Sequence, residues 1–407
     1  MRRGVGVLNF VLSTSEASVK KRTPVETLQQ FSLPLIAGVI MALLWANLGH
    51  DSYHRFVHWA PFGGEFNFHF LVNDIGMVFF FGIATKEIVE SFLPGGALSP
   101  VKKAVNPLLG TLGGVLGPIG VYFVCVHLFG DASIKNGWGI PTATDIAIAW
   151  LVAKIVFGAK HPAVSFLLLL AIADDAIGLI IIAVFYPDPA HPVQPIYLLI
   201  VVWGMFWAYK YRRLENDKYK NGNYWVFLVG GGLSWAGLFF AGLHPALALV
   251  PIVPFMPGPR RDEGLFAEKG KGHTDTLNRF EHAFKLPVDI GLFAFGLANA
   301  GVVFSAIGEA TWAVLLALAI GKTVGITTFS LAARRFGFPL PTGMNTRSLI
   351  VASTVAAIGL TVALFVAGVA FTDATTIAAA KMGALFSAGM AMVAITAGKV
   401  LRLKEIN

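Results

Sequence analysis

The run LLLLAIADDAIGLIIIAVF (167–185) places two adjacent carboxylates, Asp174 and Asp175, in the middle of an otherwise apolar segment. A helix needs about 20 mostly apolar residues to cross a bilayer, and this run has that length. An ionisable group at such a depth costs roughly 3 kcal/mol on insertion scales and usually marks a transport pathway or a proton relay. The run therefore predicts a membrane-spanning helix with a functional site halfway along it.

The composition extends this interpretation to the whole chain. Of the 407 residues, 56% are hydrophobic and 13% are charged, whereas an ordinary soluble domain carries about 25% charged residues. So little charge cannot cover a surface in water, which indicates an integral membrane protein, and apolar runs of the length of a spanning helix make the expected fold all-α. Cys125 is the single cysteine, which excludes an internal disulfide and disfavours a cysteine-based metal site.

Roughly twelve apolar runs are long enough to be candidate spans. They lie near 31–48, 71–93, 104–129, 138–158, 162–186, 193–210, 224–241, 243–257, 287–308, 310–333, 346–371 and 374–400. We therefore expect one transmembrane domain over 31–401. The remaining segments are a leader over 1–30, an extracytoplasmic hairpin or interfacial segment over 49–70, a cytoplasmic loop over 258–284 and a tail over 402–407.

The distribution of Lys and Arg predicts the orientation. With the N-terminus inside, the outside loops hold only Arg55 and Lys135, and most of the other basic residues fall in cytoplasmic segments. This asymmetry follows the positive-inside rule, and an even number of spans places both termini in the cytoplasm. The formal net charge of +8 is then explained by the basic cytoplasmic segments of a chain embedded in lipid. It gives no reason to expect that the protein binds nucleic acid.

The aspartate pair favours ion exchange. Two carboxylates this close cannot both ionise cheaply in a medium of low dielectric constant, so they suit a site that alternates between protons and a hard cation. Lys322 lies in AVLLALAIGKTVGITTFSL (313–331) and is the only Lys or Arg that we place near the middle of a late span. A buried lysine needs a carboxylate partner, and Asp174 or Asp175 is the obvious one. The alternative is a static salt bridge that only holds helices together.

Two spans contain signals of interruption. Pro141 removes a helix hydrogen bond shortly before Thr144 and Asp145, and a second candidate break lies around Gly359 in AIGLT (357–361). Broken helices in corresponding halves of a transporter commonly form its substrate site. At a crossing of broken helices, Asp145 is expected to offset the positive helix ends and a lysine the negative ends.

Other ionisable residues allow two interpretations each. Lys86, Glu87 and Glu90 form either a solvated helix end or a charged funnel that attracts cations or senses pH. His244 is either a pH-titrating group or simply a packed side chain. The spaced histidines His50, His54 and His58 resemble a metal face, but an interfacial amphipathic segment is the preferred interpretation.

Several motifs are missing from the sequence. It contains no GxxxxGK[ST] phosphate loop, so ATP-driven transport by this chain is not expected. It also lacks zinc and haem motifs and a G-x-S-x-G elbow. We therefore expect no enzyme activity and no cofactor beyond the transported ions.

The chain resembles the NhaA-type sodium/proton antiporter family over nearly its whole length after the leader. The strongest matches are PTATDIAIAW (141–150), LAIADDAIGLIIIAVFY (170–186), LFAFGLANAGV (292–302), IGKTVGI (320–326) and AIGLTVALFVA (357–367). The resemblance implies twelve helices in inverted-topology repeats, with the fourth and eleventh discontinuous. It implies electrogenic exchange of cytoplasmic sodium or lithium for external protons across a bacterial inner membrane.

The resemblance also implies roles for individual residues. Asp175 matches the principal cation-binding carboxylate, Asp174 its partner paired with Lys322, and Thr144 and Asp145 the crossing site. The hairpin over 57–69, around Gly63 and Gly64, resembles a homodimer contact. The match is weakest at ATKEIVE (84–90), where the family usually shows an acidic residue followed by Lys-Arg-Glu, so the pH response of this chain is expected to differ.

Two rival functions remain open from the sequence. A sodium-coupled symporter of an organic anion on a related inverted-repeat fold would use Lys322 to hold the carboxylate of its substrate. A cation channel or a non-transporting sensor is the second rival, although an adjacent aspartate pair with a buried lysine differs from the ring of ligands that a pore uses.

Overall fold

The structure, a computed structural model, describes residues 33–60, 66–96, 98–99, 101–129, 132–187, 192–218, 223–259, 275–401 and 403. Every regular element in these ranges is helical. The first half contains α3 (Leu33–Leu48), α4 (His50–Val57), α5 (Phe68–Phe70), η1 (Leu71–Gly76), α6 (Met77–Ser91), α7 (Val101–Phe129), η2 (Ala132–Thr142), α8 (Ile146–Phe157), α9 (Pro162–Phe185), η3 (Pro195–Tyr197) and α10 (Leu198–Lys218).

The second half continues in the same way. It contains α11 (Trp225–Ala241), η4 (Pro245–Leu247), η5 (Val253–Phe255), α12 (Thr276–Asn299), η6 (Phe304–Ala306), α13 (Glu309–Leu316), η7 (Ala317–Lys322), α14 (Thr323–Arg335), α15 (Thr346–Ala356), α16 (Thr361–Ala370), α17 (Ala374–Phe386), η8 (Ser387–Gly389) and α18 (Met390–Val400). The all-α fold class is confirmed.

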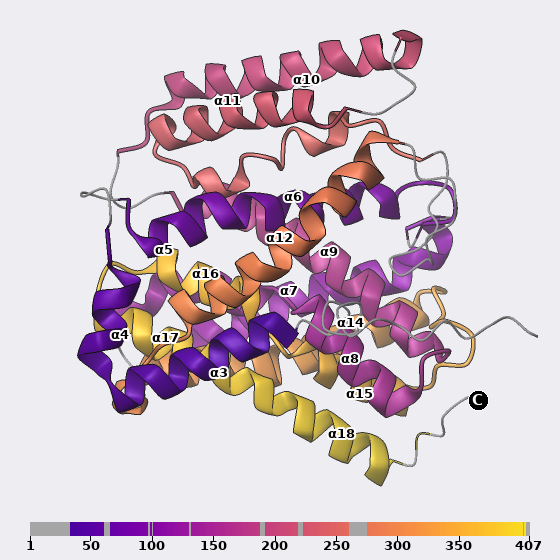
Figure 1. Ribbon diagram of the computed structural model, residues 1–407. Helices are drawn as coiled ribbons and strands as arrows, with labels where there is room; N and C mark the ends of the chain where they lie inside the picture. The colour runs from indigo at the N-terminus through magenta and orange to yellow at the C-terminus, as the bar shows by residue number, and fades with distance from the viewer. Residues whose placement is uncertain are drawn as a thin grey trace, which may run out of the picture.

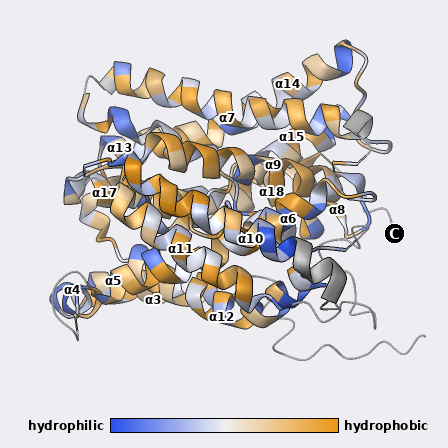
Figure 2. Cartoon of the chain, turned by 90° about the horizontal axis from the view of Figure 1, so that it is seen from above, coloured by the Kyte–Doolittle hydropathy of each residue, from blue (hydrophilic) through white to orange (hydrophobic). Residues whose placement is uncertain are grey.

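Several of these helices are long and apolar enough to cross a membrane. Within the described residues, five continuous helices meet that criterion, and two bent pairs raise the number to seven. Figure 2 shows apolar residues along most of the helices, with hydrophilic residues gathered mainly near helix ends and loops. The chain is therefore a multi-pass membrane protein, as the composition predicts.

The two predicted helix interruptions are present. The pair η2 and α8 bends by 58° after Pro141, and the pair α15 and α16 bends by 49° around Gly359. Pro141 leaves the helical region, with φ −83° and ψ 16°. The two breaks meet in space, because the backbone N–H of Asp145 donates to the carbonyl of Ile358 at 2.8 Å.

Two of the predicted spans differ in the structure. The run 243–257 forms only the short 3₁₀ turns η4 and η5, because Pro245, Pro251 and Pro254 remove backbone donors that a continuous helix needs. The predicted span 287–308 corresponds to α12, which begins at Thr276 and ends at Asn299. Polar residues at its N-terminal end concealed its true start, and Pro287 is accommodated within it.

The arrangement separates peripheral helices from a central bundle (Figure 1). The pair α10 and α11 lies along one edge of the molecule, and α12 crosses obliquely between that pair and α3. The long helix α7 packs against α14 and α9, and α17 packs against α13 and α16. The predicted leader, most of the 258–284 loop, residues 61–65 of the hairpin and nearly all of the tail lie outside the described residues.

Glycines allow α7 and α14 to approach at backbone distance. A Cβ on Gly113 would meet the carbonyl oxygen of Gly325, and a Cβ on Gly117 would meet that of Gly321. Small residues at helix contacts are a common basis of association in membranes, where packing replaces the hydrophobic effect. This contact fixes α14, and with it Lys322, against the bundle.

We expect Gly113→Ala to destabilise the protein by about 1–3 kcal/mol, the usual cost of overpacking. The matched control is Gly120→Ala on the same helix, because a Cβ at Gly120 meets no atom within 4 Å. Thermal unfolding in detergent measures both variants. Equal melting temperatures for the two would contradict the inferred α7–α14 contact.

Candidate ion-binding site

The crossing of the broken helices places four helix ends in the protein interior, and Asp145 serves the two N-terminal ends. Its Oδ1 accepts a hydrogen bond from the N–H of Ile148 in α8 at 3.1 Å. Its Oδ2 accepts from the hydroxyl of Thr361 at 2.6 Å and from the N–H of Thr361 at 3.3 Å, at the start of α16. A carboxylate at this place offsets the partial positive charges of both helix N-termini.

The two C-terminal ends are served by Lys322 and Thr144. The ammonium of Lys322 donates to the carbonyl of Thr142, the last residue of η2, at 2.7 Å. The hydroxyl of Thr144 lies 3.0 Å from the carbonyl of Ala356, the last residue of α15. The crossing is therefore neutralised end by end.

A salt bridge joins the crossing to the aspartate pair. Nζ of Lys322 lies 3.0 Å from Oδ2 of Asp174, and both side chains are fully buried. The hydroxyl of Thr144 lies 2.8 Å from the same Oδ2. The structure thus pairs Lys322 with Asp174 and leaves Asp175 outside the ion pair.

Asp175 occupies a more accessible position. It is half-buried and borders a cavity of about 10 Å³, which it shares with Phe80, Phe81, Ala84, Leu179, Ile182 and Val362. A cavity of this size is at the lower limit for one water molecule. Of the two adjacent aspartates, Asp175 is therefore the one that the surrounding helices cover less.

Each aspartate has one buried oxygen without a hydrogen-bond donor among the described residues. These atoms are Oδ1 of Asp174 and Oδ1 of Asp175. Buried polar atoms are nearly always satisfied in native proteins, so an unsatisfied one needs an explanation, such as an ion. Carboxylate oxygens are hard ligands that suit a hard cation or a proton.

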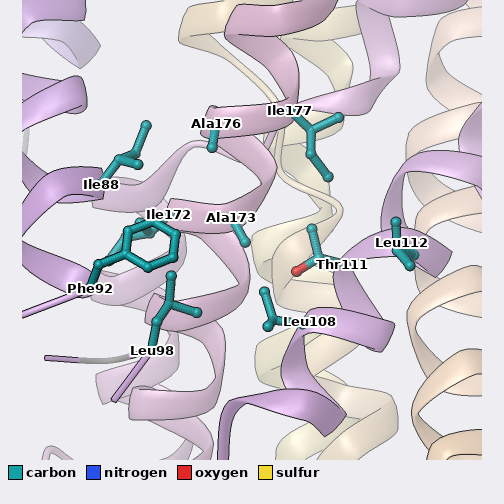
Figure 3. A pocket seen from close by; sticks show the side chains of 10 residues that line it. All are labelled: Ile88, Phe92, Leu98, Leu108, Thr111, Leu112, Ile172, Ala173, Ala176 and Ile177. Atoms are coloured by element: carbon teal, nitrogen blue, oxygen red, sulfur yellow. The ribbon is translucent and has the colours of Figure 1, made fainter. Parts of the chain in front are cut away.

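The opposite flank of the aspartate pair is an apolar crevice of about 310 Å³ (Figure 3). Side chains of α6, α7 and α9 and Leu98 line it: Ile88, Phe92, Leu98, Leu108, Thr111, Leu112, Ile172, Ala173, Ala176 and Ile177. The hydroxyl of Thr111 donates within its own helix, to the carbonyl of Pro107 at 3.1 Å. Thr111 is the single polar side chain in this lining, so the crevice offers no carboxylate to a cation.

The 86–90 cluster is a buried interhelix contact, and the alternative of a solvated helix end is wrong. Nζ of Lys86 lies 3.5 Å from Glu87, 2.5 Å from Glu90 and 2.8 Å from Glu281 of α12. Lys86 and Glu90 are both buried. The cluster joins α6 to α12 through one cation and three carboxylates, and Glu281 was not found from the sequence because it lies in a segment assigned to a loop.

His244 follows α11 and precedes η4, and its ring lies edge-on to Phe365 of α16 with centroids 5.5 Å apart. His50, His54 and His58 lie on the exposed face at α4, and His54 and His58 stack 4.1 Å apart. Among the described residues, no group of three His, Cys, Asp or Glu side chains has the geometry of a metal site.

Two ionisable groups inside the helical bundle were not predicted from the sequence. Lys381 of α17 is buried, so Lys322 is not the only lysine within a late span. Asp289 lies midway along α12 and has a buried carboxylate oxygen. Lys381 lies a third of the way into its predicted span, and Asp289 close to the assumed start of its own, so neither stood out as a charge at mid-span.

These features define a class: a multi-pass membrane protein with two crossed, broken helices and a buried carboxylate pair. The model of the family described as Na+/H+ antiporter 1 matches residues 24–399. The chain belongs to this family. It is 57% identical over 386 residues to the Na(+)/H(+) antiporter NhaA of Geobacter sulfurreducens, covering 95% of this chain and 100% of the relative.

Two further relatives agree. The Na(+)/H(+) antiporter NhaA of Desulfitobacterium hafniense is 57% identical over 392 residues, with 96% of this chain and 99% of the relative covered. The Na(+)/H(+) antiporter NhaA of Jannaschia sp. is 46% identical over 410 residues, with 92% and 97% covered.

Lys322→Met is expected to lower the free energy of unfolding by about 3–5 kcal/mol, because it leaves the Asp174 carboxylate buried without a counter-charge. The double variant Asp174→Asn with Lys322→Met removes both charges and is expected to recover part of that loss. Thermal unfolding in detergent at one fixed pH measures the set, with the exposed Lys160→Met as control. A double variant no more stable than Lys322→Met alone would argue against a direct charge pair.

Proposed function

We propose that the chain exchanges sodium for protons, as the names of its relatives state for those proteins. The observation that supports this best is a pair of adjacent carboxylates, Asp174 and Asp175, beside the crossing of two broken helices, with Lys322 bound to only one of them. Such a site holds either protons or a hard cation. Because the two ions compete for this site, the gradient of one can drive transport of the other, and the chain itself needs no energy source.

The cation is expected to bind at the unsatisfied carboxylate oxygens of the aspartate pair. Oδ1 of Asp174 and Oδ1 of Asp175 are the available atoms, and Thr144 and Asp145 hold the crossing around them. Asp175 is the principal ligand in this proposal, because it is half-buried and borders the small cavity. Lithium, which has the same charge and ligand preference, is expected to compete for the same atoms.

Proton coupling follows from competition for these oxygens. When sodium binds from the cytoplasmic side, it displaces the proton of Asp175 and competes with Lys322 for the Asp174 carboxylate. Lys322 then releases Asp174, and its freed ammonium can give up a further proton. The loaded protein then exposes the site to the other side, where protons displace the sodium. The form that has lost both its cation and its protons keeps two adjacent negative charges, and burying them is costly, so it does not change sides and ions do not leak.

A bacterial inner membrane supplies the driving force in this proposal. If more protons enter than sodium ions leave, net positive charge moves inward in each cycle. The membrane potential, worth about 2.3 kcal/mol per charge at 100 mV, then drives sodium out. This predicts electrogenic exchange that serves sodium and pH homeostasis. In the same proposal both termini lie in the cytoplasm, as the distribution of Lys and Arg predicts.

We expect Asp175→Asn to reduce sodium-dependent proton flux in proteoliposomes to the background of empty vesicles, because the amide can neither release a proton nor neutralise the cation. Asp373→Asn is the matched control, since Asp373 is an exposed N-cap of α17 whose capping role an amide retains. The flux of this control is expected to match the unsubstituted protein. Near-normal exchange by Asp175→Asn would overturn the site assignment.

A sodium-coupled symporter of an organic anion is the alternative function. It would use Lys322 to bind the substrate, but this ammonium is already held by Asp174 and by the carbonyl of Thr142. The same proteoliposomes separate the two functions. Exchange predicts that sodium alone dissipates an imposed pH gradient, whereas symport predicts no dissipation until the organic solute is added.

Two further expectations remain proposals. A homodimer through the 57–69 hairpin is supported by Trp59 and Phe66, which flank residues 61–65 and are 62% and 59% exposed. Measuring the mass of the complex in nanodiscs, with and without Trp59→Ser and Phe66→Ser, tests it. The role of Lys86, Glu87, Glu90 and His244 in the pH response likewise stays a prediction.

A further inference from the structure

A second buried polar cluster lies outside the ion-binding site. It consists of His69, Asn73, Asn299 and Lys381, and we name it the outer cluster. Asn73, Asn299 and Lys381 are only 8%, 3% and 8% exposed. The members come from three separate spans, since His69 and Asn73 precede α6, Asn299 ends α12, and Lys381 lies in α17.

Hydrogen bonds connect all four members. Nδ2 of Asn299 donates to Oδ1 of Asn73 at 2.8 Å, and Nδ2 of Asn73 lies 2.8 Å from Nε2 of His69. Nζ of Lys381 donates to Oδ1 of Asn299 at 3.3 Å. Among the described residues, Lys381 makes no salt bridge, so its ammonium is held by a neutral amide.

The cluster lies on the extracytoplasmic side of the site in the predicted topology. Along α6, Phe81 borders the cavity of Asp175 and follows Asn73 by eight residues, or about 12 Å of helix. Along α17 and η8, Ser387 bonds the backbone of Gly359 at the crossing and follows Lys381 by six residues, or about 9 Å. Two independent helices thus place the cluster about two turns outside the crossing.

The cluster also joins two groups of helices, which otherwise meet where α12 contacts α16 and where Phe81 of α6 packs on Phe365 of α16. The helices α6 and α12 pack on each other, and α12 packs on α3, whereas α17 packs on α13 and α16. The side chain of Lys381 lies beside Gly368 of α16 and reaches from there to Asn299. Any motion that separates α17 from α12 must break this hydrogen bond.

We propose that the outer cluster is the extracytoplasmic gate of the transport route, closed in this structure, and that Lys381 is its charged element. This proposal rests on the proposed function in that the route carries a cation. The gate opens when Lys381 leaves Asn299 and water reaches the cavity of Asp175. While the gate is closed, the ammonium repels external cations from that cavity.

A labelling experiment tests the gate without requiring exchange activity. In a Cys125→Ser background, Val362→Cys places a thiol on the wall of the Asp175 cavity. Membrane-impermeant methanethiosulfonate reagents, one a trimethylammonium cation and one a sulfonate anion, are added to right-side-out vesicles. Lys381→Met is expected to raise labelling by the cationic reagent about tenfold, the factor that ~1.4 kcal/mol represents, and labelling by the anionic reagent less.

Two controls make the result specific. Lys381→Arg keeps the charge and is expected to label like the unsubstituted protein. Lys399→Met removes an exposed lysine from the last helix and is expected to change nothing. Unchanged labelling in Lys381→Met, or an equal increase from the cytoplasmic side in inside-out vesicles, would overturn the gate, because a merely loosened protein admits reagent from both sides.

A transport measurement distinguishes failure of the gate from failure of the proposed function. In vesicles of both orientations, Lys381→Met is expected to lower the external sodium concentration that half-inhibits exchange and to leave the cytoplasmic KM for sodium unchanged. If Lys381→Met changes the response to external sodium and to cytoplasmic sodium equally, the gate is contradicted and the proposed function is not. Absence of sodium-dependent proton flux in the unsubstituted protein contradicts the proposed function, while the labelling result still decides the gate.

Discussion

The structure depends on the compensation of four helix ends at the crossing of two broken spans. An interrupted helix inside a bilayer leaves backbone groups and partial charges without partners, and each unsatisfied group costs several kcal/mol. Asp145 supplies acceptors to the two N-terminal ends, and Lys322 and Thr144 serve the two C-terminal ends. The same Lys322 and Thr144 then contact Asp174. Stability of the crossing and occupancy of the site are therefore linked through two side chains.

This linkage suggests why the aspartates are adjacent but unequal. Asp174 is held by Lys322 and belongs to the crossing, whereas Asp175 is half-buried beside a small cavity and stays outside the ion pair. A cation that binds both carboxylates competes with Lys322 for Asp174, so binding alters the compensation of the helix ends. Ion binding can thereby change the relative energies of the two orientations of the bundle, which a site remote from the crossing would not do.

Much of the site could be predicted from the sequence, because charge in an apolar span is a strong signal. Asp174, Asp175, Lys322 and Asp145 each stand in a long apolar run, and Pro141 marks a break. Lys381 and Asp289 were missed because apolar runs do not show where a span begins, so neither stood out as a charge in the middle of its span. The run 243–257 was misassigned because a hydropathy scale does not take into account that proline lacks the backbone N–H of a helix hydrogen bond. Glu281, one of the partners of Lys86, could be found only from three-dimensional contacts, since it is distant in the sequence.

The central claim is that sodium and protons compete for the aspartate pair. It is tested most directly by adding sodium to the purified protein in a weakly buffered detergent solution and measuring the release of protons. The account predicts that sodium binding releases protons in proportion to the site occupied, and that choline chloride at the same concentration releases none. Sodium binding without proton release would contradict competition and would require separate sites for the two ions.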